Sequence, residues 1–197
     1  TRWITVGTDK EHNEKVLLLV GRHENLWAGL GYHPHCASDI TDADMELLKK
    51  QAHDAKVVAL GECGLDYYYM NSEREVQRAA FAAQAATPRS RRMPAPIHVR
   101  GDEPNAFEEL LDIWLAETRG EAEGVLHCYT GTLEFAQRAI EAGFYISFSG
   151  ILTFKNDRGL REVAKALPLE RLMVETDAPL LAPQGFRGKH NAPAHGS

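Results

Sequence analysis

The chain has 197 residues, enough for one domain with its own hydrophobic core. Its net charge of −6, from 22 basic and 28 acidic residues, excludes a general electrostatic attraction to nucleic acid or anionic lipid, although metal ions and local cations can still hold phosphates. No apolar run approaches the roughly 18 residues that a membrane span needs. The three cysteines form no Cys-x-x-Cys pair and indicate reduced thiols, so we expect a cytoplasmic protein.

Short apolar runs alternate with helical patterns along the chain. The predicted strands are residues 3–6, 26–30, 56–61, 96–99, 124–126, 144–148 and 172–174. The predicted helices cover 10–20, a segment capped by Thr41, a segment starting at the Ser72-Glu-Arg-Glu75 capping box, 106–115, the segment from Thr132 to Gly143, and 158–167. Such alternation predicts parallel strands joined by right-handed helical crossovers.

Two α/β architectures fit seven strands and six helices: an open doubly wound sheet, or a barrel of the (β/α)8 TIM type. An open sheet binds ligands at its switch point. Here polar residues follow most of the strands, which favours the ring of loops at the carboxyl end of a barrel. We therefore predict one TIM-type barrel domain over residues 1–197, with seven of the eight strands present.

Four metal-capable side chains stand at or directly after predicted strands, 36, 29 and 50 residues apart: Glu62, His98, His127 and Asp177. Parallel strands of one sheet bring their carboxyl ends together, so these four side chains could converge on one pocket. Imidazole and carboxylate ligands suit Zn²⁺, Mn²⁺ or Mg²⁺ without choosing among them. Two ions about 4 Å apart could activate water and stabilise a leaving oxygen.

Simpler interpretations compete with this one. A single histidine at a strand end is more often a hydrogen-bonded structural residue than a ligand, and the coincidence of four such groups is what favours a metal site. Asp66 is more often a turn or cap residue than a ligand. The three tyrosines that follow, Tyr67, Tyr68 and Tyr69, could stack on nucleobases or simply be half-buried in packing.

Six segments together carry a resemblance to a known family. They are Gly31-Tyr-His-Pro-His35, Gly61-Glu-Cys-Gly-Leu-Asp-Tyr-Tyr68, Ile97-His-Val-Arg100, Leu126-His-Cys-Tyr-Thr-Gly131, Tyr145-Ile-Ser-Phe-Ser-Gly150 and Glu175-Thr-Asp-Ala-Pro179, followed by Arg187-Gly-Lys-His-Asn191 in the tail. Their order and approximate spacing resemble the signatures of the TatD family of metal-dependent deoxyribonucleases across nearly the whole chain. Each motif alone is weak, but the set is specific.

The resemblance implies a barrel of the metal-dependent hydrolase kind, two divalent ions, and hydrolysis of phosphodiester bonds in DNA, commonly at single-stranded or 3′ ends. By position, Glu62 matches the carboxylate that joins the two metals, and His98 and His127 match the ligands of one of them. Asp177 matches the acid that binds the other metal and acts as general base. Residues that match positions near the substrate phosphates are His33, Arg100, Arg187, Lys189 and Asn191.

The resemblance also shows two departures. Family members begin with a strand that carries a His-x-His metal-binding pair, and they end with a closing helix; this chain starts after the first and stops before the second. His12 stands in a helical run and cannot replace that pair. We therefore expect a domain incomplete at both ends that binds one of its metals poorly.

Three functions follow. The leading hypothesis is a divalent-metal-dependent nuclease, a 3′–5′ exonuclease acting on DNA ends. The second is a two-metal hydrolase of another ester or amide, since fold does not determine substrate. The third is a metal-poor, inactive relative that serves as a binding or structural protein. The sequence leaves the native metal and the oligomeric state undetermined.

Overall fold

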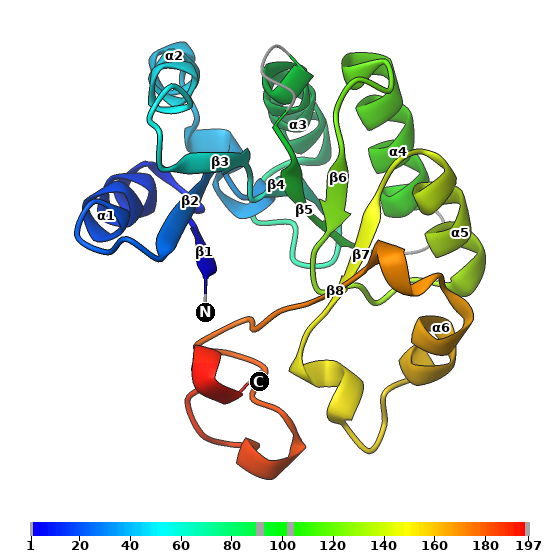
Figure 1. Ribbon diagram of the computed structural model, residues 1–197. Helices are drawn as coiled ribbons and strands as arrows, with labels where there is room; N and C mark the ends of the chain where they lie inside the picture. Colours follow the sequence, from blue (N-terminus) through cyan, green and yellow to red (C-terminus); the bar gives the residue numbers. More distant parts are fainter. Residues whose placement is uncertain (1, 90–92, 102–104, 196–197) are drawn as a thin grey trace. The chain divides into compact units, whose positions relative to one another are not determined.

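The computed structural model describes residues 2–89, 93–101 and 105–195 (Figure 1). Over these residues eight β-strands and six α-helices follow one another, and all the strand pairs given below are parallel. The chain divides into two compact units, Thr1–Gly124 and Val125–Ser197, and each is described by itself. Among the described residues, no helix combines the length and apolar character needed to cross a membrane.

The first unit holds two groups of parallel strands. Its strands are β1 (Trp3–Val6), β2 (Leu26–Leu30), β3 (Val57–Leu60), β4 (Cys63–Asp66) and β5 (Ala95–Arg100). The first three form a sheet in the order β1-β2-β3, and β4 pairs with β5. The carboxyl ends of the strands in each group therefore point the same way, as the alternating pattern predicts.

Helices connect these strands in the expected places. They are α1 (Lys10–Val20), α2 (Asp42–Gln51), α3 (Arg74–Arg89), α4 (Asn105–Thr118) and the short 3₁₀ helix η1 (Pro34–Asp39). Thr41 caps α2 as predicted, and Asp44 completes a capping box by accepting from the Thr41 N–H. Hydrogen bonds from Thr41 and from Lys10 of α1 lower the pKa of Asp44 to about 2, so this carboxylate ties α2 to α1.

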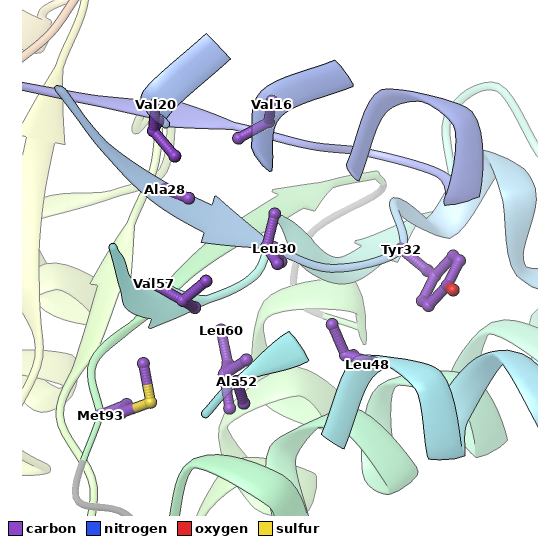
Figure 2. Close-up of a cluster of buried hydrophobic side chains, with 10 residues drawn as sticks. All are labelled: Val16, Val20, Ala28, Leu30, Tyr32, Leu48, Ala52, Val57, Leu60 and Met93. Carbon is purple, nitrogen blue, oxygen red and sulfur yellow. The ribbon is translucent and has the colours of Figure 1, made fainter. Parts of the chain in front are cut away.

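The core of the first unit lies between its helices and the β1-β2-β3 sheet (Figure 2). Its buried side chains come from α1, α2 and its last turn, β2, β3 and the adjoining loops: Val16, Val20, Ala28, Leu30, Tyr32, Leu48, Ala52, Val57, Leu60 and Met93. Burial of these groups anchors β2 and β3 up to their last residues. The loops that follow the two strands therefore start from fixed positions.

The strand count corrects the sequence prediction of seven. The segment after β3 was expected to be a loop, but residues 63–66 form β4 and pair with β5, with Cys63 opposite Ile97 and Asp66 opposite Arg100. Gly64 permits this pairing because a Cβ at that position would collide with the backbone carbonyl of His98. A four-residue run that contains glycine carries no alternating apolar pattern, and for this reason the sequence did not reveal it.

The second unit is a three-stranded parallel sheet with two α-helices. Its elements are β6 (Gly124–Leu126), α5 (Leu133–Glu141), β7 (Tyr145–Phe148), η2 (Gly150–Thr153), α6 (Leu160–Ala166), η3 (Leu169–Arg171), β8 (Leu172–Val174), η4 (Gln184–Phe186) and η5 (Pro193–His195). Strand β7 pairs with both β6 and β8. Thr132 caps α5 by accepting from the Phe135 N–H, and Gly143 (φ 94°) follows the end of the helix, both as predicted.

Candidate metal centre

Three metal-capable side chains of the first unit meet beyond the ends of its strands. His33 follows β2, Glu62 lies between β3 and β4, and His98 stands near the end of β5. Glu62 Oε1 lies 3.6 Å from His33 Nε2 and 3.4 Å from His98 Nδ1, and the potential ligand atoms of the three all fall within 4.8 Å of one another. All three side chains are largely but not fully buried.

Close backbone contact between two strand ends brings His33 and Glu62 together. A Cβ on Gly31 would lie 2.6 Å from the Cα of Gly61. The two backbone segments could therefore not approach so closely with a larger residue at position 31. The Gly61 N–H donates to the carbonyl of Leu30, which continues the β2–β3 pairing to this point. The glycines of the two motifs thus have a packing role as well as giving space around Glu62.

Asp66, at the end of β4, orients His98. Its Oδ2 lies 2.9 Å from His98 Nε2 and 3.0 Å from His35 Nε2, and its side chain is fully buried. Burial alone would raise the pKa of Asp66, but the hydrogen bond from His98 and others outweigh it and lower the pKa. Since an ionised carboxylate only accepts, Asp66 favours a proton on His98 Nε2, and Nδ1 faces Glu62.

The other histidine of the cluster is held in the opposite way. The backbone N–H of His35 donates to His33 Nδ1 over 3.2 Å. The proton of the neutral His33 ring is therefore on Nε2, towards Glu62. Burial and the neighbouring His98 lower the pKa of His33 to about 4, so the ring is neutral near pH 7. His33 therefore presents an N–H to the cluster, whereas Nδ1 of His98 faces Glu62, where a metal ion would replace any proton on that nitrogen.

The second unit contains a matching arrangement. His127, directly after β6, has its Nδ1 2.7 Å from Glu175 Oε2 and its Nε2 3.4 Å from Asp177 Oδ1. Glu175 is fixed in turn by the Cys128 N–H and the Ser147 hydroxyl, at 2.7 and 2.6 Å. The order carboxylate–histidine–carboxylate is the same as in Asp66–His98–Glu62: one acid holds the proton of the ring, and the second nitrogen faces another acid.

The donor set suits divalent cations. In both units an imidazole nitrogen and a carboxylate oxygen face each other across 3.4 Å, and a cation between them would satisfy both. Burial lowers the pKa of His98, yet hydrogen bonds to Asp66 and Glu62 outweigh this and raise it. The carboxylates that attract a proton to this ring would also attract a metal ion, and mixed N/O ligation suits Zn²⁺, Mn²⁺ or Mg²⁺.

Comparison with known proteins agrees with this chemistry. The sequence model of the family described as TatD related DNase matches residues 1–196. The chain belongs to the TatD-related DNase family. A crystal structure of the TatD homologue YJJV from Escherichia coli K12 superposes with a TM-score of 0.88 at 30% identity, covering 98% of this chain and 73% of that one. The predicted α/β fold class of the TIM-barrel type is thereby confirmed.

Two curated relatives of this TatD-family chain indicate its general activity. A protein of Bacillus subtilis named "Uncharacterized metal-dependent hydrolase YabD" is 36% identical, and one of Enterobacter lignolyticus named "3'-5' ssDNA/RNA exonuclease TatD" is 37% identical. Each alignment covers 98% of this chain and 74% of the relative. The chain is thus a member of a metal-dependent hydrolase family, as predicted.

The residues that the TatD resemblance places near substrate have varied surroundings. The Arg100 guanidinium lies over the rings of Tyr68 and Tyr69, 4.4 and 4.8 Å from their centroids. That of Arg187 lies 3.9 Å from the Phe154 ring centroid, and Lys189 is exposed. These positions leave a role in substrate binding open, and that role stays a prediction.

Asn191, another of the predicted substrate residues, is buried in the second unit. Its Nδ2 donates to the Thr176 hydroxyl over 2.9 Å, and its Oδ1 accepts from the Ala192 N–H. Since Thr176 stands between Glu175 and Asp177, this contact anchors the tail to the acidic loop. A direct substrate contact by Asn191 stays a prediction, beside this structural role.

Sequence reasoning did not predict that Asp66 and Glu175 orient the histidines. Asp66 does cap a turn as interpreted, because its Oδ1 accepts from the N–H groups of Tyr68 and Tyr69, but its Oδ2 also holds His98. Recognition of β4 would have revealed this, since Asp66 ends that strand. Glu175 shares a face with Asp177 two residues later, and that alternation was the signal for its position beside the site.

Proposed function

We propose that this protein is a divalent-metal-dependent deoxyribonuclease that hydrolyses phosphodiester bonds from the 3′ end of DNA, preferably single-stranded DNA. The observation that carries the proposal is the pair of carboxylate–histidine–carboxylate arrangements, Asp66–His98–Glu62 and Glu175–His127–Asp177. The relative named as a 3'-5' ssDNA/RNA exonuclease, at 37% identity over 197 residues, supports the choice of substrate and polarity.

Two divalent ions are proposed as the cofactors, with Glu62, His98, His127 and Asp177 among their ligands. When bound, such ions acidify water and offset the negative charge that develops on phosphoryl oxygens. The protein contributes rigid ligand geometry. Asp66 and Glu175 each accept from one ring nitrogen, so that the other nitrogen of His98 faces Glu62 and that of His127 faces Asp177.

The remaining side chains have separate tasks in the proposed reaction. Asp177 accepts a proton from the attacking water, whose oxygen bonds to phosphorus while the bond to the 3′ oxygen of the preceding nucleotide breaks. The departing 3′ oxygen takes up a proton and leaves as a hydroxyl group. His33 donates its Nε2–H to a non-bridging phosphoryl oxygen, in keeping with its neutral, proton-bearing state. Because the protein has a net charge of −6, local cations must bind the neighbouring phosphates of the DNA. These cations are Arg100, Arg187 and Lys189.

A direct assay tests the function. Single-stranded DNA labelled at its 5′ end and incubated with the protein and Mg²⁺ or Mn²⁺ is expected to shorten progressively from the 3′ end, and EDTA is expected to stop the reaction. The same preparation is assayed on small aryl esters and lactones. Hydrolysis of these esters without cleavage of DNA would reject the nuclease in favour of another two-metal hydrolase, and inactivity on every substrate would favour a binding protein.

Glu62→Gln is the sharpest single test of the site, because it keeps the size of the side chain and removes its charge. We expect the rate of DNA cleavage to fall by about 10³-fold or more, with an unchanged circular dichroism spectrum. The matched control is Glu141→Gln at the exposed end of α5, which should keep full activity. Near-full activity of Glu62→Gln would reject this carboxylate as a catalytic ligand.

A further inference from the structure

Two exposed aromatic rings beside the candidate metal centre have no role in the chemistry described so far. Tyr68 is 63% exposed and Tyr69 54%, and Met70, 43% exposed, extends the run. Consecutive large apolar residues are rarely left on a surface unless they bind something. The preceding Tyr67 differs: its hydroxyl donates to Glu109 over 2.8 Å and Arg74 covers its ring, so it is part of the packing.

The two exposed rings are held in a defined arrangement. Asp66 Oδ1 accepts from the N–H groups of Tyr68 and Tyr69 at 3.0 and 2.9 Å, which fixes the turn that carries them. The rings pack edge to face with centroids 4.8 Å apart, and Arg100, at the end of β5, lies over both. We call Tyr68, Tyr69 and Arg100 the aromatic ledge. Its rings lose little further freedom when a planar ligand binds.

The aromatic ledge borders the histidine cluster. The Tyr69 ring centroid lies 5.5 Å from that of His35, and the His35 ring lies 4.3 Å from that of His33. Asp66 connects the two features directly, because one of its oxygens holds the ledge turn and the other holds His98. A group bound on the ledge would therefore be about one side chain away from a group held at His33.

We propose that the aromatic ledge stacks a nucleobase of the single-stranded substrate whose phosphate is held at the His33–Glu62–His98 cluster. Aromatic rings supplemented by arginine are the usual means of binding unpaired bases, since every base has a π face. A chain with a net charge of −6 gains little affinity from overall charge, so stacking supplies what electrostatics does not. This inference rests on the proposed function for its choice of ligand.

The test compares two fluorescein-labelled DNA strands about ten nucleotides long, both with phosphorothioate linkages that resist hydrolysis. One has thymine throughout, and the other lacks the bases of its 3′-terminal nucleotides. Binding is measured by fluorescence anisotropy with Mn²⁺ for the unaltered protein and for three variants. These are Tyr68→Ala/Tyr69→Ala, Tyr68→Phe/Tyr69→Phe, and the control Trp27→Ala. The Trp27 ring also lies under a cation, that of Lys56, but it belongs to the start of β2.

We expect the unaltered protein to bind the base-bearing strand about ten-fold more tightly than the abasic strand. The double alanine variant should bring this ratio close to one, the phenylalanine variant should restore it, and Trp27→Ala should keep it. Circular dichroism checks that each variant is folded. A ratio near one in the unaltered protein, or a ratio that survives Tyr68→Ala/Tyr69→Ala, would overturn the inference.

Other outcomes separate the ledge from the proposed function. If the unmodified strand is not hydrolysed but the binding ratio persists, the nuclease proposal fails and the base site stands. If the unmodified strand is hydrolysed but the binding ratio is near one, the nuclease proposal stands and the base site is rejected. If neither labelled strand binds, both proposals are rejected. If the double alanine variant alters only the sedimentation behaviour of the protein, the ledge is a protein contact and the inference is wrong.

Discussion

At the scale of single residues, His98 and His127 each depend on an acid that is not itself a proposed ligand. Asp66 is fully buried and cannot exchange its partners for water. One of its oxygens contacts His98 and His35, and the other accepts from the backbone of the tyrosine turn. Such outer carboxylates determine the tautomer of the ligand and the direction of its lone pair.

This dependence predicts the effect of Asp66→Asn. The asparagine oxygen can keep the bonds from the Tyr68 and Tyr69 N–H groups, but its NH₂ group then faces His98 Nε2. Because Nε2 must then accept, His98 keeps its proton on Nδ1, the nitrogen that faces Glu62, where the proton competes with a metal ion. We expect Mn²⁺ affinity, measured by isothermal titration calorimetry, to fall by about 10- to 100-fold.

The control for this experiment is Asp112→Asn, which makes the same chemical change at an exposed position of α4. It should leave the affinity for Mn²⁺ unchanged. Unaltered Mn²⁺ binding by Asp66→Asn, with the fold intact, would show that Asp66 serves only the turn.

At the scale of elements, helix α3 supports two strand ends through buried glutamines two turns apart. Gln77 accepts from the Asp66 N–H and donates to the Asp66 carbonyl, and Gln84 makes the same pair of bonds with the backbone of Tyr32, next to His33. A glutamine offers one acceptor and a donor group side by side, which matches one residue of extended backbone. The loops that carry His33 and Asp66 are thereby held by one rigid helix.

This arrangement predicts a large cost for Gln84→Leu. The leucine fills similar space but leaves the buried N–H and C=O of Tyr32 without partners, and each such loss costs about 1–3 kcal/mol. We expect the free energy of unfolding, from urea titration, to fall by about 2–4 kcal/mol. Gln137→Leu on the exposed face of α5 is the matched control and should change it by less than about 0.5 kcal/mol. Equal effects of the two changes would contradict the proposed support.

Sequence patterns revealed some of these elements and not others, for physical reasons. The cap at Thr41 and the helix between Thr132 and Gly143 depend on neighbours in the chain, so local signals sufficed to predict them. Strand β4 depends on pairing with β5, and the roles of Gln77 and Gln84 depend on backbone groups 11 and 52 residues away. Partners so distant in sequence leave no local pattern, which is why the orienting acids were underestimated.

At the scale of the whole molecule, the family resemblance supplied what local signals could not: six weak motifs in the right order identified the TatD family and its fold class. The separate motifs gave the residue types but not their hydrogen bonds. Only the coordinates show what each ring nitrogen meets: His98 Nε2 meets Asp66, whereas His33 Nδ1 accepts from the backbone N–H of His35. Assignment of all four proposed ligands to bound ions stays a prediction, and the stability of the molecule offers a test of it.

Metal binding to the first unit should raise its thermal stability, since an ion that binds only the folded chain stabilises it by about 2.7 kcal/mol at 100 times Kd. For a chain of this size that corresponds to roughly 5–11 °C in Tm. The three tryptophans, Trp3, Trp27 and Trp114, all belong to the first unit, so their fluorescence reports its unfolding, whereas far-ultraviolet circular dichroism reports both units. Mn²⁺ should raise the fluorescence midpoint in the unaltered protein and in Glu141→Gln, and much less in Glu62→Gln. An equal rise in Glu62→Gln would place the bound ion elsewhere and remove Glu62 from the set of ligands.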